Sequence, residues 1–253
     1  GHLFLIDGGK LMELDMQSNV LWSYSTCSIS HAFDFAENGQ FIIDRDAYFD
    51  EASKKCYERD TKPTDLVRIE IISPDKEVLW SWRGEEHKEE ILRLTGGSDE
   101  DITRDNNNWC EILKDNPLAQ KDKRFKKGNI LFSYNSASLI GIIDYPKGEV
   151  VWAWGWGDLD GQHAPTMLDN GNLLIFDNGR NRGWARVIEL NPLTEEIVWE
   201  YRMEPKEDFY VQNGGSAQRL PNGNTLICEG WNNKIFEVTP EGEIVWDFIS
   251  ELN

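Results

Sequence analysis

The pattern that decides the fold is Ile197-Val198-Trp199-Glu200-Tyr201, in which an aliphatic residue, a tryptophan and an aromatic residue occupy alternate positions. Further copies occupy residues 20–24, 78–82, 150–154 and 244–248. Side chains at alternate positions point to the same face of an extended strand, whereas a helix would spread them around its axis. Each copy therefore predicts a β-strand with one apolar, aromatic face.

The copies recur along the whole chain, and the tryptophans of the last three copies, at positions 152, 199 and 246, are equally spaced. A Pro- or Gly-containing turn and a shorter apolar strand precede each of the last four copies. Further upstream, Asn-Gly pairs such as Asn170-Gly171 and Asn222-Gly223 predict a second hairpin. Each unit is thus expected to contain four antiparallel strands, and such units arranged radially form an all-β propeller.

The repeats predict five blades, with six as the alternative, in a single domain over residues 1–253. A sixth blade would have to lie within 83–105, where the sequence instead predicts a helix at 85–94 and an acidic loop. We expect inserts at about 45–65 and 83–105. Because 249–253 resembles the end of an inner strand such as 218–222, we expect it to complete the first blade and close the ring.

Composition limits the range of partners. The chain has 45 acidic residues against 26 basic ones, a net charge of −19, which opposes binding to nucleic acid or to anionic membranes. No stretch reaches the ~20 apolar residues of a membrane span, and no secretory signal is evident. Sequence gives no indication of a protein partner. The four cysteines lack the spacing of a metal site, and their disulfide state is left open. They are Cys27, Cys56, Cys110 and Cys228.

Motifs of several enzyme classes are missing from the sequence. It contains no G-x-S-x-G, P-loop, G-x-G-x-x-G or H-E-x-x-H, so triad hydrolases, NTPases, dinucleotide enzymes and zincins are unsupported. Asp158-Leu159-Asp160-Gly161 resembles the start of a calcium loop but lacks the remaining ligands. We therefore predict no metal ion and no cofactor.

In a propeller, the loops before the inner strands and the loops between the second and third strands emerge on one face, the channel mouth. Histidines there could act as nucleophile or acid–base, arginines could hold an anion, and tryptophans could stack on a flat ring. The same residue types also serve as hydrogen-bonded structural histidines, salt-bridged arginines and core aromatics. The candidate residues are His31, His163, Arg180 and Arg182 for catalysis, and Asn106, Asn108, Gln162, Asn178, Trp156 and Trp231 for substrate binding.

A family resemblance rests on Gly161-Gln162-His163 and on residues 168–179, which end in Phe176-Asp177-Asn178-Gly179. Together with 186–190, 197–201 and 215–227, these segments resemble the bacterial and archaeal arylsulfotransferases, over roughly residues 105–248. The resemblance implies a propeller enzyme that moves a sulfuryl group from a phenol sulfate to a phenol through a sulfated histidine at the channel mouth, without a nucleotide donor. It also favours an extracytoplasmic location.

By this resemblance, His163 takes the position of the family's Gln-His pair, and Arg180 or Arg182 takes that of the arginine after Phe-Asp-Asn-Gly. Asn108 corresponds to the asparagine of a His-x-Asn motif, whose histidine is replaced here by Asn106. An amide cannot accept a sulfuryl group as an imidazole does. If the chain transfers sulfate, His163 or His31 must be the acceptor.

Two other functions remain open at this point. One is a non-catalytic propeller that binds a small anionic aromatic ligand, or a protein, at the same mouth. The other is a quinone-binding propeller, because the Gly-x-Val-Val-Trp run at 148–152 resembles quinoprotein repeats, although that family has more blades than are predicted here. Turnover of an aryl sulfate favours the transferase, and a colourless protein argues against a bound quinone.

Overall fold

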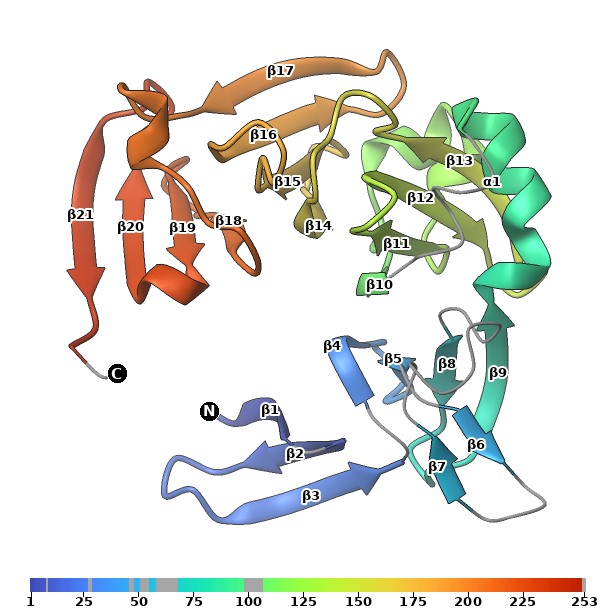
Figure 1. The fold of residues 1–253 in the computed structure, drawn as a ribbon. Helices are drawn as coiled ribbons and strands as arrows, with labels where there is room; N and C mark the ends of the chain where they lie inside the picture. Colours follow the sequence, from blue (N-terminus) through green and yellow to red (C-terminus); the bar gives the residue numbers. More distant parts are fainter. Residues whose placement is uncertain are drawn as a thin grey trace.

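A computed structural model of the protein describes residues 1–7, 9–26, 29–45, 48–50, 55–57, 68–97 and 107–251. Five sheets of three or four strands are arranged in an arc around a common centre (Figure 1). Antiparallel pairing holds throughout, so the predicted all-β, five-bladed propeller is confirmed. Within the described residues, no helix has the length and apolar character needed to cross a membrane.

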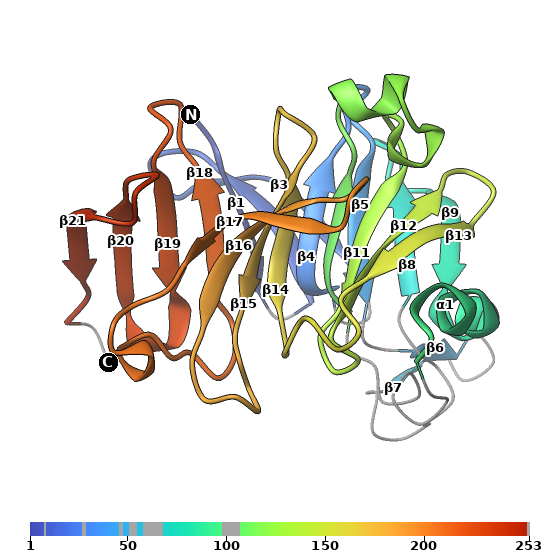
Figure 2. The ribbon, with the colours of Figure 1, turned by 90° about the horizontal axis from the view of Figure 1, so that it is seen from above.

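In each blade the strands follow chain order from the inner strand to the outer one (Figures 1 and 2). The first blade contains β1 (Leu3–Asp7), β2 (Lys10–Leu14) and β3 (Val20–Ser25). The second contains β4 (Ile29–Phe35), β5 (Phe41–Arg45), β8 (Arg68–Ile72) and β9 (Val78–Arg83). The third contains β10 (Asn107–Ile112), β11 (Ile130–Tyr134), β12 (Leu139–Asp144) and β13 (Glu149–Trp154). The fourth contains β14 (His163–Met167), β15 (Leu173–Asp177), β16 (Arg186–Asn191) and β17 (Glu196–Tyr201). The fifth contains β18 (Ser216–Arg219), β19 (Thr225–Glu229), β20 (Lys234–Val238) and β21 (Ile244–Ile249).

The apolar core is divided into clusters that lie between consecutive blades. In the third blade, Phe132 packs towards the second blade and its neighbour Leu131 towards the fourth. In the fourth blade, Ile175 packs towards the third and Leu174 towards the fifth. Because successive side chains of a strand point to opposite faces, a strand buried on both faces must be apolar at consecutive positions. This explains the unbroken apolar runs in β11 and β15.

The outer-strand tryptophans join each blade to the next. The indole N–H of Trp80 donates to the Pro146 carbonyl at 3.0 Å, and that of Trp199 donates to the Pro240 carbonyl at 2.7 Å. Both carbonyls belong to the turn between the third and fourth strands of the following blade. In the last blade, the corresponding Trp246 is 49% exposed. The repeated pattern therefore marks the strands that contact the next blade. In its last copy, Trp246 is exposed instead.

Carboxylates on the inner strands make a second connection between blades. Asp34 of β4 accepts a hydrogen bond from the backbone N–H of Ile112 at 2.9 Å. Glu111 of β10 accepts one from the backbone N–H of Met167 in β14 at 3.2 Å. Burial raises the pKa of Glu111 to about 7, and the charge of Asp34 contributes to the increase. Burial also raises the pKa of Asp34.

The described residues do not form the predicted closing strand at 249–253. Ile249 instead ends β21, where it pairs with Lys234, and the Ser250 N–H donates to the Asn233 carbonyl. The first blade accordingly has three strands among the described residues, and it faces the fifth across the break in the ring (Figure 1). Residues 252–253 lie outside the described part.

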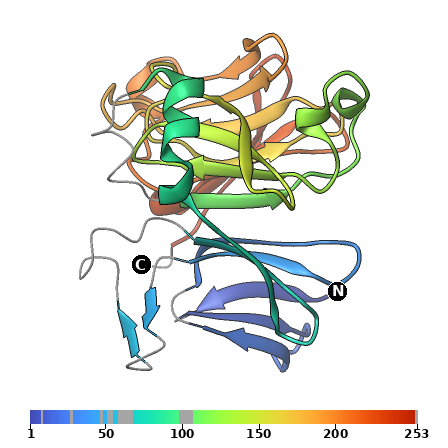
Figure 3. The same cartoon turned by 90° about the vertical axis from the view of Figure 1, so that its right-hand side faces the viewer.

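The inserts lie at the edge of the propeller (Figure 3). The predicted helix is confirmed as a 3-10 turn, Gly84–His87, followed by α1 (Lys88–Thr95). The earlier insert contains the two-stranded sheet of β6 (Tyr48–Asp50) and β7 (Lys55–Tyr57). The remaining 3-10 turns are Pro117–Gln120, Lys123–Phe125, Lys206–Asp208 and Gly230–Asn232.

Cys110 and Cys228 are free thiols. Cys27 and the Cys56 side chain lie outside the described part.

Replacing Glu111 with Gln should stabilise the protein at high pH but not at low pH. The ordinary pKa of a glutamate is 4.5, so between 4.5 and about 7 the folded chain keeps a proton that the unfolded chain releases. Stability therefore falls as pH rises through this window, by up to about 1.4 kcal/mol per pH unit. The uncharged amide of the Glu111→Gln variant can still accept from the Met167 N–H and avoids this loss.

Chemical denaturation at pH 5 and pH 8 tests this expectation. The stability gain of Glu111→Gln should be clearly larger at pH 8, whereas Glu243→Gln, in an exposed turn, should show no such difference. An equal effect of Glu111→Gln at both pH values would show that Glu111 is ionised throughout.

Candidate functional site

The predicted mouth residues come together between the third, fourth and fifth blades. His163 is the first residue of β14, and Asn178 directly follows β15. The His163 ring and the Asn178 amide meet because the loop before an inner strand and the loop after the second strand emerge at the same end of a blade. His31 is the third residue of β4, the inner strand of the second blade, and is exposed. Asn106 lies outside the described residues.

Gln162 and Asn108 attach the backbone next to His163 to the third blade. The buried Gln162 amide donates to the Ser133 hydroxyl at 2.9 Å and to the Leu139 carbonyl at 2.8 Å. Asn108 donates to the Gln162 carbonyl at 2.8 Å. Their exposed fractions are 0% and 4%. Both predicted substrate-binding residues thus attach the loop before β14 to the third blade, with little surface left for a ligand.

The His163 ring is held in one tautomer. The Asn178 amide nitrogen donates to the carbonyls of Val211 and Gly214, so its oxygen faces His163 Nδ1 at 2.7 Å. That oxygen can only accept, so Nδ1 carries the proton and donates. The Nε2 lone pair then accepts from the Gly214 N–H at 3.1 Å. Both ring nitrogens therefore have a partner in this structure.

The environment keeps the His163 imidazole neutral. Burial lowers its pKa below the ordinary value of 6.5. The Asn178 hydrogen bond opposes this lowering, whereas the positive charges of Arg180 and His31 add to it. A neutral imidazole with a basic Nε2 is the form that can act as a base or nucleophile.

Arg180 lies beside this histidine and contacts amide oxygens. It donates to Asn135 Oδ1 at 2.6 Å and to Asn213 Oδ1 at 3.1 Å. Among the described residues, no carboxylate forms an ion pair with it. Asn135 also donates to the Gly161 and Gln162 carbonyls, which fixes its amide orientation. The guanidinium is therefore oriented, and no carboxylate of the described residues compensates its positive charge.

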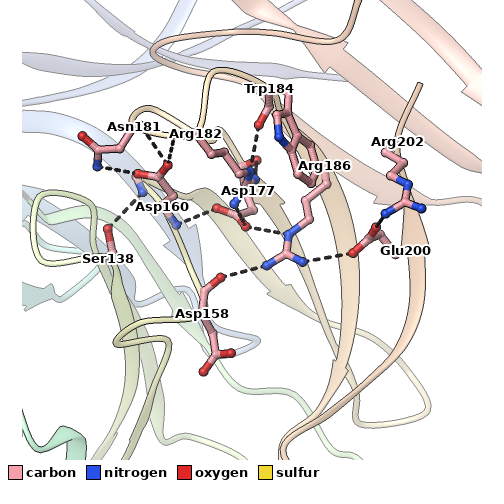
Figure 4. Close-up of polar contacts among 11 residues, drawn as sticks. Ser138, Asp158, Asp160, Asp177, Asn181, Arg182, Trp184, Arg186, Glu200 and Arg202 are labelled. Carbon is pink, nitrogen blue, oxygen red and sulfur yellow. Dashed lines mark hydrogen bonds and ion pairs between the residues drawn. The ribbon is translucent and has the colours of Figure 1, made fainter. Parts of the chain in front are cut away.

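Arg182 has a different environment (Figure 4). It pairs with the buried Asp177 carboxylate at 2.8 Å, and Arg186 pairs with the same oxygen at the same distance. Arg186 also reaches Glu200 at 3.0 Å. Asp160 accepts from the backbone N–H groups of Asn181 and Arg182 and so holds this loop in place. This network satisfies the charge of Arg182, so the geometry favours Arg180 as the anion ligand.

The two predicted stacking tryptophans are in separate places. Trp156 lines a groove of about 810 Å³ between the third and fourth blades, together with Trp184 and Ser138. His163 and Arg180 do not line this groove. Trp231, in the turn after β19, lies against Gly214: a Cβ built there would be 3.3 Å from its ring. Trp231 is thus close to the residue whose N–H bonds His163 Nε2.

Two contributors were missing from the predicted site. Asn135 directly follows β11 just as Asn178 directly follows β15, so equivalent positions in consecutive blades could have identified it. Asn213 has no such signal, because its role depends on a long loop between β17 and β18. The described residues contain no group of three His, Cys, Asp or Glu side chains placed to hold a metal.

Comparison with solved structures shows similar propellers at low sequence identity. A Bacteroides caccae protein of unknown function is 16% identical, with a TM-score of 0.61, and the match covers 99% of this chain and 78% of that protein. Virginiamycin B lyase from Staphylococcus aureus is also 16% identical, with a TM-score of 0.52 and coverage of 89% and 57%. An auxiliary nutrient binding protein from Bacteroides ovatus is 14% identical, with a TM-score of 0.56 and coverage of 96% and 53%. These likenesses concern the fold.

Sequence comparison is more specific. A search of curated proteins gave no match. The family model for arylsulfotransferases (ASST), in contrast, matches residues 8–251, which is nearly the whole chain and extends the resemblance into the first two blades. The chain belongs to the arylsulfotransferase (ASST) family.

Proposed function

We propose that the protein binds the sulfate group of an aryl sulfate on Arg180 and transfers the sulfuryl group to a phenol through His163. The observation that carries the proposal is the Arg180 guanidinium, which contacts only amide oxygens among the described residues. An anion that replaces these neutral acceptors gains charge-assisted hydrogen bonds without having to displace a carboxylate. In a chain with a net charge of −19, such an uncompensated cation is a specific feature.

His163 has the protonation state that the transfer requires. Its Nε2 lone pair would attack the sulfur as the sulfur–oxygen bond to the aryl group breaks, and the phenolate would leave and take up a proton. A second phenol would then lose its proton, and its oxygen would attack the same sulfur. The nitrogen–sulfur bond would break and the neutral imidazole would be restored. Arg180 would stabilise the sulfate oxygens throughout.

His31 is the second imidazole in this proposal. It lies in β4, the inner strand of the second blade, seven residues before Asn38-Gly39, just as His163 lies seven residues before Asn170-Gly171 in the fourth blade. The lowering of the His163 pKa by the charge of His31 supports its assignment to the same site. We assign it the exchange of protons with the phenol oxygens, which is the role that Asn106 cannot perform.

One observation favours the non-catalytic alternative. The Gly214 N–H occupies His163 Nε2 at 3.1 Å, so the lone pair becomes available only if the backbone at Gly214 moves. If it does not move, the same site binds a sulfate ester without attacking it. Binding and turnover therefore have to be measured separately.

Removing the Arg180 charge should weaken sulfate-ester binding. We expect Arg180→Met to reduce the affinity for phenyl sulfate by roughly tenfold to a hundredfold, as expected for loss of charge-assisted hydrogen bonds. Isothermal titration calorimetry measures this directly. Arg202→Met is the matched control, because Arg202 is 45% exposed and pairs with Glu200 and Glu204. An unchanged affinity in Arg180→Met would show that Arg180 does not bind the sulfate group.

His163 should be needed for turnover but not for binding. With 4-nitrophenyl sulfate as donor, we expect the wild type to release at most about one 4-nitrophenol per chain without phenol, and to turn over continuously only when phenol is added as acceptor. His163→Gln should abolish this release, because an amide cannot carry the sulfuryl group, and should retain affinity for phenyl sulfate. Release of 4-nitrophenol by His163→Gln would contradict the covalent role. A wild type that binds phenyl sulfate without any release would establish the non-catalytic alternative.

A further inference from the structure

One of the mouth tryptophans differs from the others in exposure. Trp154 is 8% exposed and belongs to the core. Trp184 carries the Arg182 guanidinium at 4.5 Å and the Lys206 ammonium at 4.6 Å over its ring. Trp156 lines the separate groove, and a Cβ built on Gly97 would lie 3.2 Å from its ring. Trp231, in contrast, is 73% exposed, and no described cation or aromatic ring stacks on it.

This exposed ring is connected to the site through two consecutive residues. The Gly214 backbone, which donates to His163 Nε2, touches the Trp231 edge: a Cβ on Gly214 would lie 3.3 Å from Cδ1 and 3.5 Å from Nε1. The preceding residue, Asn213, accepts from Arg180. Because Gly214 has no side chain, the indole can approach its backbone closely. The indole thus lies beside the residue that bonds His163, and the preceding residue bonds Arg180.

The turn that carries Trp231 is held at both sides. The Asn232 amide donates to the Tyr210 carbonyl at 3.0 Å and to Glu229 Oε2 at 2.6 Å. Glu229 itself is 2% exposed. The indole is therefore presented to solvent by an anchored turn. A large apolar ring that is exposed in this way next to a charged site is suited to a flat ligand ring.

We propose that Trp231 is the platform for the aromatic ring of the ligand and makes the site prefer aryl over alkyl sulfates. This inference rests on the proposed function, because it places the sulfate of the same ligand on Arg180. Stacking between aromatic rings stabilises a pair modestly beyond the area it buries. The indole therefore sets the selectivity, while the arginine provides the affinity for the sulfate group itself.

The experiment compares two ligands that share the sulfate and differ in the ring. Calorimetric titration of the wild type should show tighter binding of phenyl sulfate than of methyl sulfate. Trp231→Ala should lose between about twofold and tenfold in affinity for phenyl sulfate and nothing for methyl sulfate. Trp231→Phe should retain most of the preference. Trp246→Ala, at an exposed tryptophan on the outer strand of the last blade, is the matched control and should change neither affinity.

Two results would overturn the platform. An equal loss for both sulfates in Trp231→Ala would show that the indole acts through the shape of the Gly214 loop. Unchanged affinities for both would show that the ring touches no ligand. If the wild type binds neither sulfate, the proposed function fails, and phenol alone then tests the platform: its binding must be lost in Trp231→Ala, and its retention there refutes the inference.

Discussion

Contact between successive blades is the constraint on which the rest of the structure depends. An outer-strand tryptophan packs on the following blade, and at Trp80 and Trp199 its indole N–H also bonds a turn carbonyl there. Apolar clusters fill the space between the sheets, and inner-strand carboxylates join them near the axis. Because these contacts fix the angle between blades, loops that are remote in sequence meet at one mouth.

The mouth itself is organised by amides. Asn178 sets the tautomer of His163, and Asn135 and Asn213 orient Arg180 without neutralising it. A few residues further along, Arg182 and Arg186 share the buried Asp177 carboxylate, which serves structure instead. Neutral oxygens at Arg180 and carboxylates at Arg182 and Arg186 thus distinguish the proposed anion site from a structural ion-pair network.

Sequence predicted the blades because their period, turns and tryptophan strands are local signals. It failed at the closing strand, since the resemblance of 249–253 to an inner strand could not show that Ile249 continues β21. It named the mouth residues but could not choose between Arg180 and Arg182, because the choice depends on which carboxylates approach in three dimensions. Sequence also could not show that Trp156 and Trp231 lie in separate places, because the residues around them come from different blades. Asn213 was missed because no repeat marks it.

We propose that the mouth, and not the groove of Trp156 and Trp184, holds the sulfate ester. A crystal structure of the protein with phenyl sulfate is the sharpest test. We expect it to show the sulfate oxygens on the Arg180 guanidinium beside His163 Nε2, with the phenyl ring over Trp231. An ester bound instead in the groove of Trp156 and Trp184, with Arg180 still bonded to Asn135 and Asn213, would contradict it.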